Sequence, residues 1–451
     1  MEFGIYGLIP TAVVIVLALW THRTIECLLA GVIVGLFMVA PSQPLALMAE
    51  ISLEVMMNET VGWVILVCGF MGSLIALFIR TGAVSAFTES VITRVHSKKG
   101  GLLTAWVLGL FLFVDDYLNS IAVGAAMRKV TDSFGTSREM LAYVVDSTAA
   151  PVSVVVPIST WAVFFGALLV ENGVAAEGQG VQFYITAIPY MFYAWIAIAI
   201  VPLVIVGWIP AMGPMRKAEE RATTGLTVPP GAEHIEAANQ SIIPKEGVRG
   251  SSAEFILPMV LLAVSTWYFD YDFLMGIYLT LTAYILMIVI RRTLTVDETY
   301  TAVLDGFKSM LEPLAALVAA YLLDAINGRM GLSEYVIEVL APHMTADLLP
   351  VTIFLTMGAL SFATGSNWGV FVIVLPIVVT LANALNADMA VVIGASLSAS
   401  TFGSHACFYT DATVLTAQAC GTTPFQHAWT QFPYALIAAA LATVGYLLLL
   451  I

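Results

Sequence analysis

Residues 98–129, KKGGLLTAWVLGLFLFVDDYLNSIAVGAAMRK, are the stretch that decides the fold. This apolar segment has a pair of cations at each end and two adjacent carboxyls, Asp115 and Asp116, in its middle. Lysine and arginine stay on the cytoplasmic side of a membrane because they are not readily translocated. Both ends are therefore expected on one side, so the segment predicts a re-entrant hairpin over 100–127 with its tip at the two aspartates. The alternative is one long helix with a misplaced basic pair.

The composition of the whole chain supports a membrane location. Of its 451 residues, 60% are hydrophobic and 11% are charged, and the mean hydropathy is +0.93. Water-soluble domains contain about 25% charged residues, so a soluble protein is excluded. The net charge of -14 and the lack of a basic patch exclude a nucleic-acid-binding protein. No nucleotide-binding or zinc-binding motif occurs, so we expect no cofactor.

Apolar segments long enough to enter a bilayer recur along the chain, and one long polar stretch separates them into two groups. The polar stretch, 210–254, carries most of the loop-forming residues and is predicted to be a cytoplasmic linker. The apolar segments are 5–20, 24–40, 61–79, 100–127, 139–170, 183–209, 255–269, 272–290, 311–327, 349–385, 389–426 and 429–451. The stretches 45–60 and 293–310 resemble amphipathic interfacial helices.

A hairpin at 100–127 makes the first half cross the membrane an odd number of times. The two halves, 1–209 and 255–451, then start on opposite sides, which defines an inverted repeat. Short matches between the halves support this: Arg80-Thr81-Gly82 with Arg329-Met330-Gly331, and Pro189-Tyr190 with Pro433-Tyr434. Such repeats, with broken helices that meet at mid-membrane, are a transporter architecture. The prediction is an all-α integral membrane fold.

Each half also contains a stretch that cannot be regular helix. In the first half, the runs 146–151 and 157–161 lie within a predicted broken helix at 139–170, and the proline in each disrupts the preceding turn. In the second half, 396–413 lies within a predicted broken helix at 389–426, after a second hairpin at 349–385. Irregular backbone at this depth survives only where protein or a water-filled cavity covers it. These places are therefore candidate sites.

Acidic side chains within apolar segments give the strongest functional signal. A charge at the bilayer centre costs roughly 2.5–3.5 kcal/mol on insertion scales, and five aspartates carry this cost unless they lie shallower or are paired structurally. Together with amides and hydroxyls at the tips and breaks, they form the predicted binding set. It comprises Asp115, Asp116, Asn119, Asp146, Ser147, Thr148, Ser159, Thr160, Asp324, Thr364, Ser366, Asn367, Thr401, His405, Asp411 and Thr413.

Oxygen ligands of this kind suit an alkali cation, and we predict a Na+ site at Asp116, Asn119, Asp146 and Ser147. A carboxylate holds either a proton or Na+, and this competition is the simplest basis for coupling the two. His405 is read equally well as a titrating group or as a packing residue. Ser404, His405 and Asp411 could form a hydrolytic triad by residue type. The GxSxG motif that usually carries the nucleophilic serine is absent, so no enzyme activity is expected.

Several long runs of this sequence resemble the NhaC-type Na+/H+ antiporter family. They are FLFVDDYLNSIAVGAAMRKVTD (111–132), SREMLAYVVDSTAAPVSVVVPISTW (137–161), FATGSNWGVFVIVLPIVV (362–379), FGSHACFYTDATVL (402–415) and QFPYAL (431–436). The resemblance implies Na+-linked secondary transport in a bacterial inner membrane by a multi-pass protein. It also implies a homodimer that forms through the first spans of each half.

One run departs from the family pattern. Where the family has an aspartate, this chain has Ser404, and Phe408 and Tyr409 add aromatic surface. The sequence therefore predicts Na+/H+ antiport by alternating access and keeps open a Na+- or H+-coupled transporter or exchanger of a small organic ion, such as an organic acid or amino acid. A channel and a membrane-embedded hydrolase are further alternatives. The expected partners are the lipid bilayer and a small inorganic or organic ion.

Overall fold

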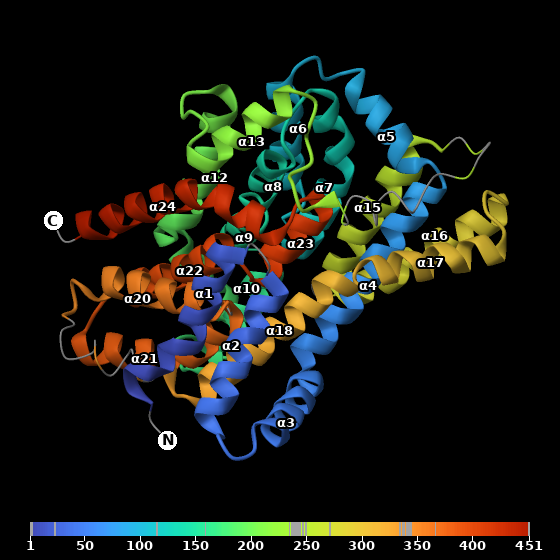
Figure 1. Ribbon diagram of the computed structural model, residues 1–451. Helices are drawn as coiled ribbons and strands as arrows, with labels where there is room; N and C mark the ends of the chain where they lie inside the picture. The colour runs from blue at the N-terminus through green and yellow to red at the C-terminus, as the bar shows by residue number, and fades with distance from the viewer. Residues whose placement is uncertain are drawn as a thin grey trace.

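The computed structural model describes residues 3–21, 24–113, 116–157, 159–233, 235, 245, 248, 250–269, 272–332, 335, 339, 345–365 and 367–449. All regular elements within these ranges are helices, as Figure 1 shows. The all-α membrane fold predicted from the sequence is confirmed.

The first half begins with η1 (Gly4–Leu8), a short 3-10 helix, and continues through twelve α-helices of the described chain. These are α1 (Ile9–Thr21), α2 (Thr24–Val39), α3 (Pro44–Met57), α4 (Glu59–Arg80), α5 (Ala83–Ile92), α6 (Lys98–Phe111), α7 (Asp116–Ser133), α8 (Arg138–Asp146), α9 (Ala150–Val155), α10 (Thr160–Glu171), α11 (Gly180–Ala187) with η2 (Ile188–Tyr190), and α12 (Phe192–Val206).

The linker contributes one helix, and the second half follows the same order of long and broken helices. The linker helix is α13 (Gly213–Thr223). The helices of the second half are α15 (Ser252–Tyr268), α16 (Phe273–Arg291), α17 (Val296–Ser309), α18 (Leu311–Arg329), α20 (Leu349–Thr364), α21 (Asn367–Leu385), α22 (Met389–Ala406), α23 (Asp411–Cys420) and α24 (Pro424–Leu448).

Both predicted hairpins are present. α6 and α7 pack on each other, and Lys98 Nζ at the start of α6 donates to the Gly135 carbonyl beyond the end of α7 at 3.2 Å. The 14 residues of α6 extend about 21 Å, too short for a hydrocarbon core of about 30 Å. α20 and α21 pack likewise, with Leu360 beside Val374 in the groove between them. The first hairpin extends over 98–133, beyond its predicted limits.

The broken helices are also present, and the first has two breaks. The two runs predicted to be irregular, 146–151 and 157–161, each lie at a break, so α8, α9 and α10 are separate pieces. Pro151 lies in the first turn of α9, and Ser159 caps α10 by accepting a hydrogen bond from Ala162 N at 3.2 Å, so each piece has its own start. α22 and α23 meet at 42°. α11 with η2 and α12, predicted as one span, bend by 56°.

Few described helices are long and apolar enough to cross a membrane unbroken. Three of them, Val61–Arg80, Leu274–Arg291 and Pro424–Leu448, meet that test by length and composition. Bent pairs add further spans. α2 and α3 form one such pair with a bend of 119°, which lays α3 across the end of the span at the place predicted for an interfacial helix.

Helix packing repeats between the halves, as an inverted repeat requires. α4 packs on α16 and α17 of the second half, and the equivalent α18 packs on α2 and α3 of the first. Within the first half α6 packs on α8, and within the second half α20 packs on α22. Between the halves, α12 packs on α22 and α24 packs on α8. The boundaries 1–209, 210–254 and 255–451 remain a prediction.

Two arginines that match in sequence occupy matching places in the repeat. Arg80 ends α4 and lies 3.6 Å from Asp305 of α17, whereas Arg329 ends α18 and binds Glu50 and Glu54 of α3 at 3.0 and 2.6 Å. Each arginine therefore ties the end of a long helix to an amphipathic helix of the other half. The pairing also accounts for Arg329, the one cation that the sequence places among acidic loops.

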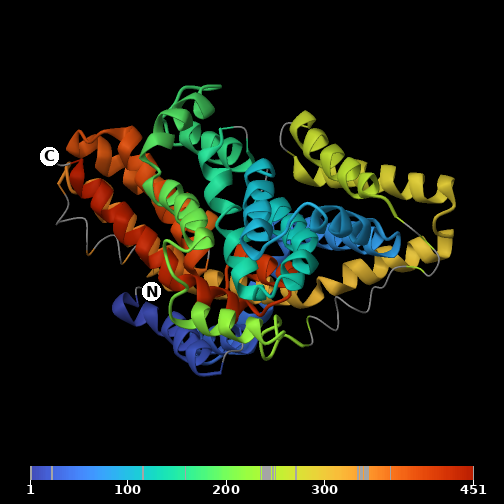
Figure 2. The ribbon, with the colours of Figure 1, turned by 90° about the horizontal axis from the view of Figure 1, so that it is seen from above.

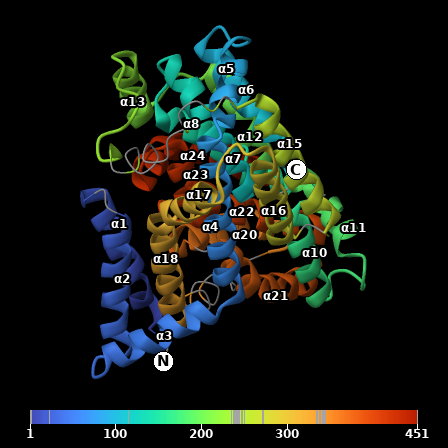
Figure 3. The same cartoon turned by 90° about the vertical axis from the view of Figure 1, so that its right-hand side faces the viewer.

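The helices can be divided into two groups, whose members can be followed in Figures 1, 2 and 3. We call α1–α5 with α15–α18 the frame, and α6–α12 with α20–α24 the site bundle. The bundle has one continuous apolar core that includes Trp161, Phe165 and Phe371. The frame contributes most of two smaller cores. Tyr117 of α7 and Leu415 of α23 join one of them, and Phe408 and Phe425 join the other.

Candidate functional site

Asp146 is the last residue of α8 and lies at the first break of the broken helix. Its side chain has no solvent exposure. Helices from both halves surround it, because α8 packs on α7, α23 and α24. A carboxylate buried at this depth requires polar partners.

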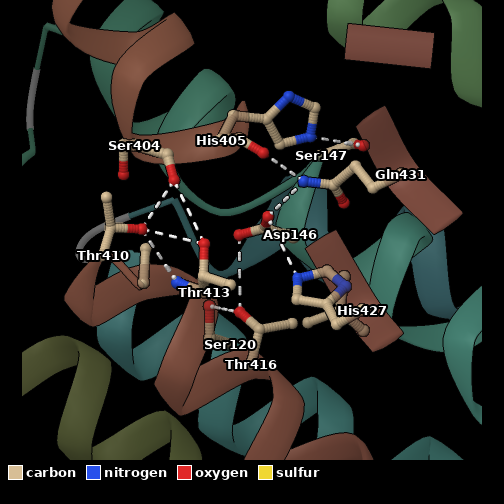
Figure 4. A network of polar contacts seen from close by, with 12 residues as sticks. Ser120, Asp146, Ser147, Ser404, His405, Thr410, Thr413, Thr416, His427 and Gln431 are labelled. Carbon is tan, nitrogen blue, oxygen red and sulfur yellow. Dashed lines mark hydrogen bonds and ion pairs between the residues drawn. The ribbon is translucent and has the colours of Figure 1, made fainter. Parts of the chain in front are cut away.

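Three side chains supply these partners, as Figure 4 shows. Gln431 Nε2 of α24 donates to Asp146 Oδ2 at 2.6 Å, and His427 Nε2, one turn earlier, lies 3.3 Å from the same oxygen. Thr416 Oγ1 of α23 lies 3.4 Å from Asp146 Oδ1 and 2.9 Å from Ser120 Oγ of α7. The carboxylate is thus held by the second half of the chain.

Gln431 joins this carboxylate to the second broken helix. Its Nε2 also donates to the backbone carbonyl of His405, near the end of α22. Gln431 Oε1 has no hydrogen-bond partner within the described residues. One amide therefore connects the break of the first half to the break of the second and leaves an oxygen available as a ligand.

His405 is held by hydroxyl groups on both sides of its ring. Its Nε2 lies 2.9 Å from Ser147 Oγ and its Nδ1 lies 2.7 Å from the Tyr193 hydroxyl of α12. A neutral imidazole has one N–H donor and one acceptor nitrogen, so two hydroxyls satisfy it completely. This geometry supports the packing interpretation of His405.

Two threonine hydroxyls close the break between α22 and α23. Thr410 Oγ1 donates to the Ser404 carbonyl at 2.8 Å, and Thr413 Oγ1 donates to the Cys407 carbonyl at 2.8 Å. Both residues belong to the turn that starts α23. Thr413, which is among the predicted ligands, thus also stabilises the break, while the Ser404 hydroxyl has no partner among the described residues.

Asp411, the first residue of α23, belongs to the same turn and has its own partner. The Tyr117 hydroxyl of α7 donates to Asp411 Oδ2, and Ala412 N donates to Oδ1 at 2.8 Å. The Tyr117 ring also faces Trp63 of the frame, with centroids 5.9 Å apart. Asp411 therefore lies where the site bundle meets the frame.

The tip of the first hairpin is attached to the first broken helix. Asn119 Nδ2 donates to the Thr148 carbonyl at 2.6 Å and to the Gly109 carbonyl at 2.7 Å. Asn119 Oδ1 has no partner among the described residues, and Asp116 is buried at the start of α7. Asp116, Asn119, Asp146 and Ser147, predicted to bind Na+, thus lie on contacting helices.

The remaining predicted residues are placed as follows. The hydroxyls of Thr148, Thr364 and Thr401 donate to carbonyls of their own helices, and Ser159 caps α10. The Asn367 carbonyl accepts from Ser400 Oγ at 3.2 Å. Asp324 is half-buried on α18 of the frame. Asp115 and Ser366 lie outside the described residues, and so does the side chain of Thr160.

Sequence reasoning missed the three side chains that contact Asp146, which are Thr416, His427 and Gln431. It also missed Ser120 beside Thr416, Tyr117 beside Asp411 and Tyr193 beside His405. One signal was available. His427 and Gln431 are four residues apart, so they share a face of an apolar helix, where polar pairs are uncommon.

Comparison with known proteins identifies the family. Residues 163–450, more than half of the chain, match the model of the Na+/H+ antiporter family. The chain belongs to the Na+/H+ antiporter family. It is therefore a multi-pass membrane transporter, which is consistent with the expectation that it is not an enzyme. The matched region includes α22, α23 and α24, which hold Asp146, although Asp146 itself precedes it.

Two further likenesses extend over nearly the whole chain. An uncharacterized protein of Haemophilus influenzae is 26% identical over 484 residues, which cover 98% of this chain and 90% of the relative. A solved structure of Neisseria gonorrhoeae MtrF, described as illuminating a class of antimetabolite efflux pumps, covers 91% of this chain and 85% of its own. The identity to MtrF is 12% and the TM-score is 0.37.

Proposed function

We propose that this transporter exchanges Na+ for H+ by alternating access, and that Asp146 binds the two cations in turn. The observation that carries this proposal is the fully buried carboxylate at a helix break of the first half, in contact with amide and hydroxyl groups from the second half. Hard oxygen ligands of this kind suit an alkali cation. The chain matches an antiporter family, which adds independent support.

The burial of Asp146 provides a reason for strict exchange. A bare carboxylate inside a membrane protein is costly, on the order of 2.5–3.5 kcal/mol by insertion scales. A proton or Na+ removes that charge, so the site bundle moves with either cation bound and seldom moves empty. The two ions then share one carboxylate and must alternate, because each competes with the other for the same oxygens.

The alternative, an organic ion as substrate, rests on the aromatic residues at the second break. Phe408 and Tyr409 replace smaller residues of the family pattern there. Phe408 is stacked on Phe425 with centroids 5.6 Å apart, and the Tyr409 hydroxyl donates to the Ala363 carbonyl at 2.7 Å. Both rings are used in packing, and this favours the inorganic cation.

Proton flux in everted membrane vesicles tests the proposal. Respiration acidifies the vesicle lumen and quenches a permeant pH dye. Addition of Na+ alone is expected to restore fluorescence, whereas an equal concentration of K+ or choline serves as the control. If Na+ has no effect until an organic acid or amino acid is added, the organic alternative is correct and Na+/H+ antiport is wrong.

A further inference from the structure

The linker helix α13 is docked onto the site bundle by one face. It packs on α8 and α24, and its Met215, Ala218 and Ala222 are buried. On the other face, Arg216 is largely exposed and pairs with Glu220 one turn later at 2.8 Å. Figure 1 shows α13 at the end of the molecule where α6 and α8 begin.

Glu219 of α13 binds the amino-terminal ends of two helices, α6 and α8. Its Oε1 accepts from the backbone N–H of Ser137 at 3.0 Å and from the Ser137 hydroxyl at 2.8 Å. Ser137 is the N-cap of α8. The other oxygen of Glu219 forms an ion pair with Lys98, the first residue of α6. One carboxylate therefore joins the beginnings of α6 and α8.

Arg221, two residues later, forms a bidentate pair with Glu139 in the first turn of α8. The two N–H···O distances are 2.9 and 2.7 Å, and Glu139 is only 1% exposed. Arg221 also donates to the Thr227 carbonyl at 3.1 Å, which in turn accepts from Arg138 N at 3.1 Å. A buried carboxylate that loses its bidentate partner is left uncompensated, so this contact fixes the start of α8.

The other end of the linker is attached to the frame instead. Lys245 Nζ binds Glu298 of α17 at 2.7 Å, and Lys245 N donates to the Arg80 carbonyl at 3.0 Å. The described contacts of the linker are thus divided: α13 binds the site bundle, and Lys245 binds the frame.

α8 connects these contacts directly to Asp146. The helix runs from Arg138 to Asp146, and every residue of it is buried, so its ends are about 12 Å apart. Packed interiors transmit displacements because they contain few voids. A change at the start of α8 therefore reaches the carboxylate at its end.

We propose that Glu219 and Arg221 are positioning residues for the cation site, which act on Asp146 through α8. They fix the linker end of α8 and so hold Asp146 against Gln431 and Thr416. The proposal rests on the proposed function in one respect, namely that Asp146 binds the transported cation. It also assigns α13 to the site bundle, so that the helix accompanies α8 during transport.

Arg221→Gln tests this proposal, with Arg216→Gln as the matched control on the exposed face of the same helix. Hydrogen–deuterium exchange of peptides covering 138–146 reports the order of α8 in purified protein. Initial rates of Na+-driven proton flux in vesicles report the KM for Na+. We expect Arg221→Gln to speed exchange in α8 and to raise the KM about tenfold, the lower end of the loss seen when groups that orient a ligand are removed. Arg216→Gln should change neither quantity.

A second variant protects the test against misfolding. Glu139→Gln with Arg221→Gln replaces the ion pair by two neutral amides, which leaves no buried charge behind, and the same direction of change is expected. Unchanged α8 exchange and unchanged KM in this double variant would overturn the proposal. A lower maximal rate with an unchanged KM would also overturn it, because that result indicates a purely structural role.

The proposed function and the positioning role fail in different ways. If the wild-type protein shows no Na+-driven proton flux, Na+/H+ exchange is wrong, but α8 exchange in the Arg221 and Arg216 variants still decides whether α13 fixes α8. If the wild-type protein exchanges Na+ for H+ and the α13 variants behave like it, only the positioning role is wrong.

Discussion

Transport is expected to depend on Asp146, the carboxylate at the end of α8. Asp146→Asn keeps the size of the side chain and removes its charge, so we expect Na+-dependent transport to be abolished while expression is intact. The exposed Asp347 offers a matched control, because Asp347→Asn changes a charge in a surface loop. Vesicle proton flux, normalised to protein in the membrane, is the measurement. Normal flux in Asp146→Asn would remove this residue from the site.

Gln431 is the residue that joins Asp146 to the second broken helix. Gln431→Ala removes the 2.6 Å hydrogen bond to Asp146 and leaves the carboxylate less well oriented. Loss of such a supporting group costs about 10- to 100-fold in metal affinity, so the KM for Na+ should rise by this factor. Gln426→Ala, on the same helix, is the control. Equal KM values in the two variants would contradict the role of Gln431.

Sequence analysis finds residues whose burial in the membrane is costly in any fold. It misses residues that matter only because a helix distant in sequence packs against them. An aspartate within an apolar run, such as Asp146, is expensive wherever the helix lies, so it is found without a structure. His427 and Gln431 become important only because α24 packs on α8. Nothing local distinguishes them from polar residues at a helix start, apart from their shared face.

At the scale of elements, the crossing of α4 and α17 depends on two glycines. A Cβ at Gly72 would lie 2.5 Å from the Gly306 carbonyl oxygen, and one at Gly306 would lie 2.4 Å from the Gly72 carbonyl oxygen. Ser73 Oγ also donates to the Val303 carbonyl at 2.8 Å across this contact. The backbones of the two helices therefore touch, which only residues without a side chain allow.

Gly72→Ala should force α4 and α17 apart. We expect a loss of stability of about 1–3 kcal/mol, the usual cost of overpacking a buried contact, measured as a lower thermal unfolding temperature in detergent. Gly62→Ala is the control on the same helix, because a Cβ there meets no atom within 4 Å. If both variants unfold at the same temperature, the close backbone contact between α4 and α17 does not stabilise the protein.

The elements that sequence analysis predicted are those with strong signals of their own. Long apolar runs with cations at their ends predicted the first hairpin, and prolines predicted the breaks. Both signals can be read from the residues of the element itself. α5 and α13 were missed, and α11 was predicted only as part of one span with α12. The buried side of α13 is made by alanines and a methionine, so its docking shows only in the contacts of Glu219 and Arg221.

At the scale of the whole molecule, the first hairpin determines which way each half faces. Cysteines introduced at the exposed Lys99 and Lys129 should react with an impermeant reagent from the same side of the membrane, and one at the exposed Glu177 should react from the other. The background lacks the native cysteines. Labelling of positions 99 and 129 from opposite faces would show that the segment crosses the membrane and that the repeat is not inverted.

The crossed arginine contacts have a consequence for how the protein is made. Arg329 reaches back to Glu50 and Glu54, and Arg80 reaches forward to Asp305, so α3 and α4 lack their partners until α17 and α18 have been synthesised. The amino-terminal half therefore remains incompletely assembled in the bilayer until the rest of the chain has been synthesised. Neither half is then a self-sufficient folding unit, and two fragments cut within the linker would each need the other to escape proteolysis.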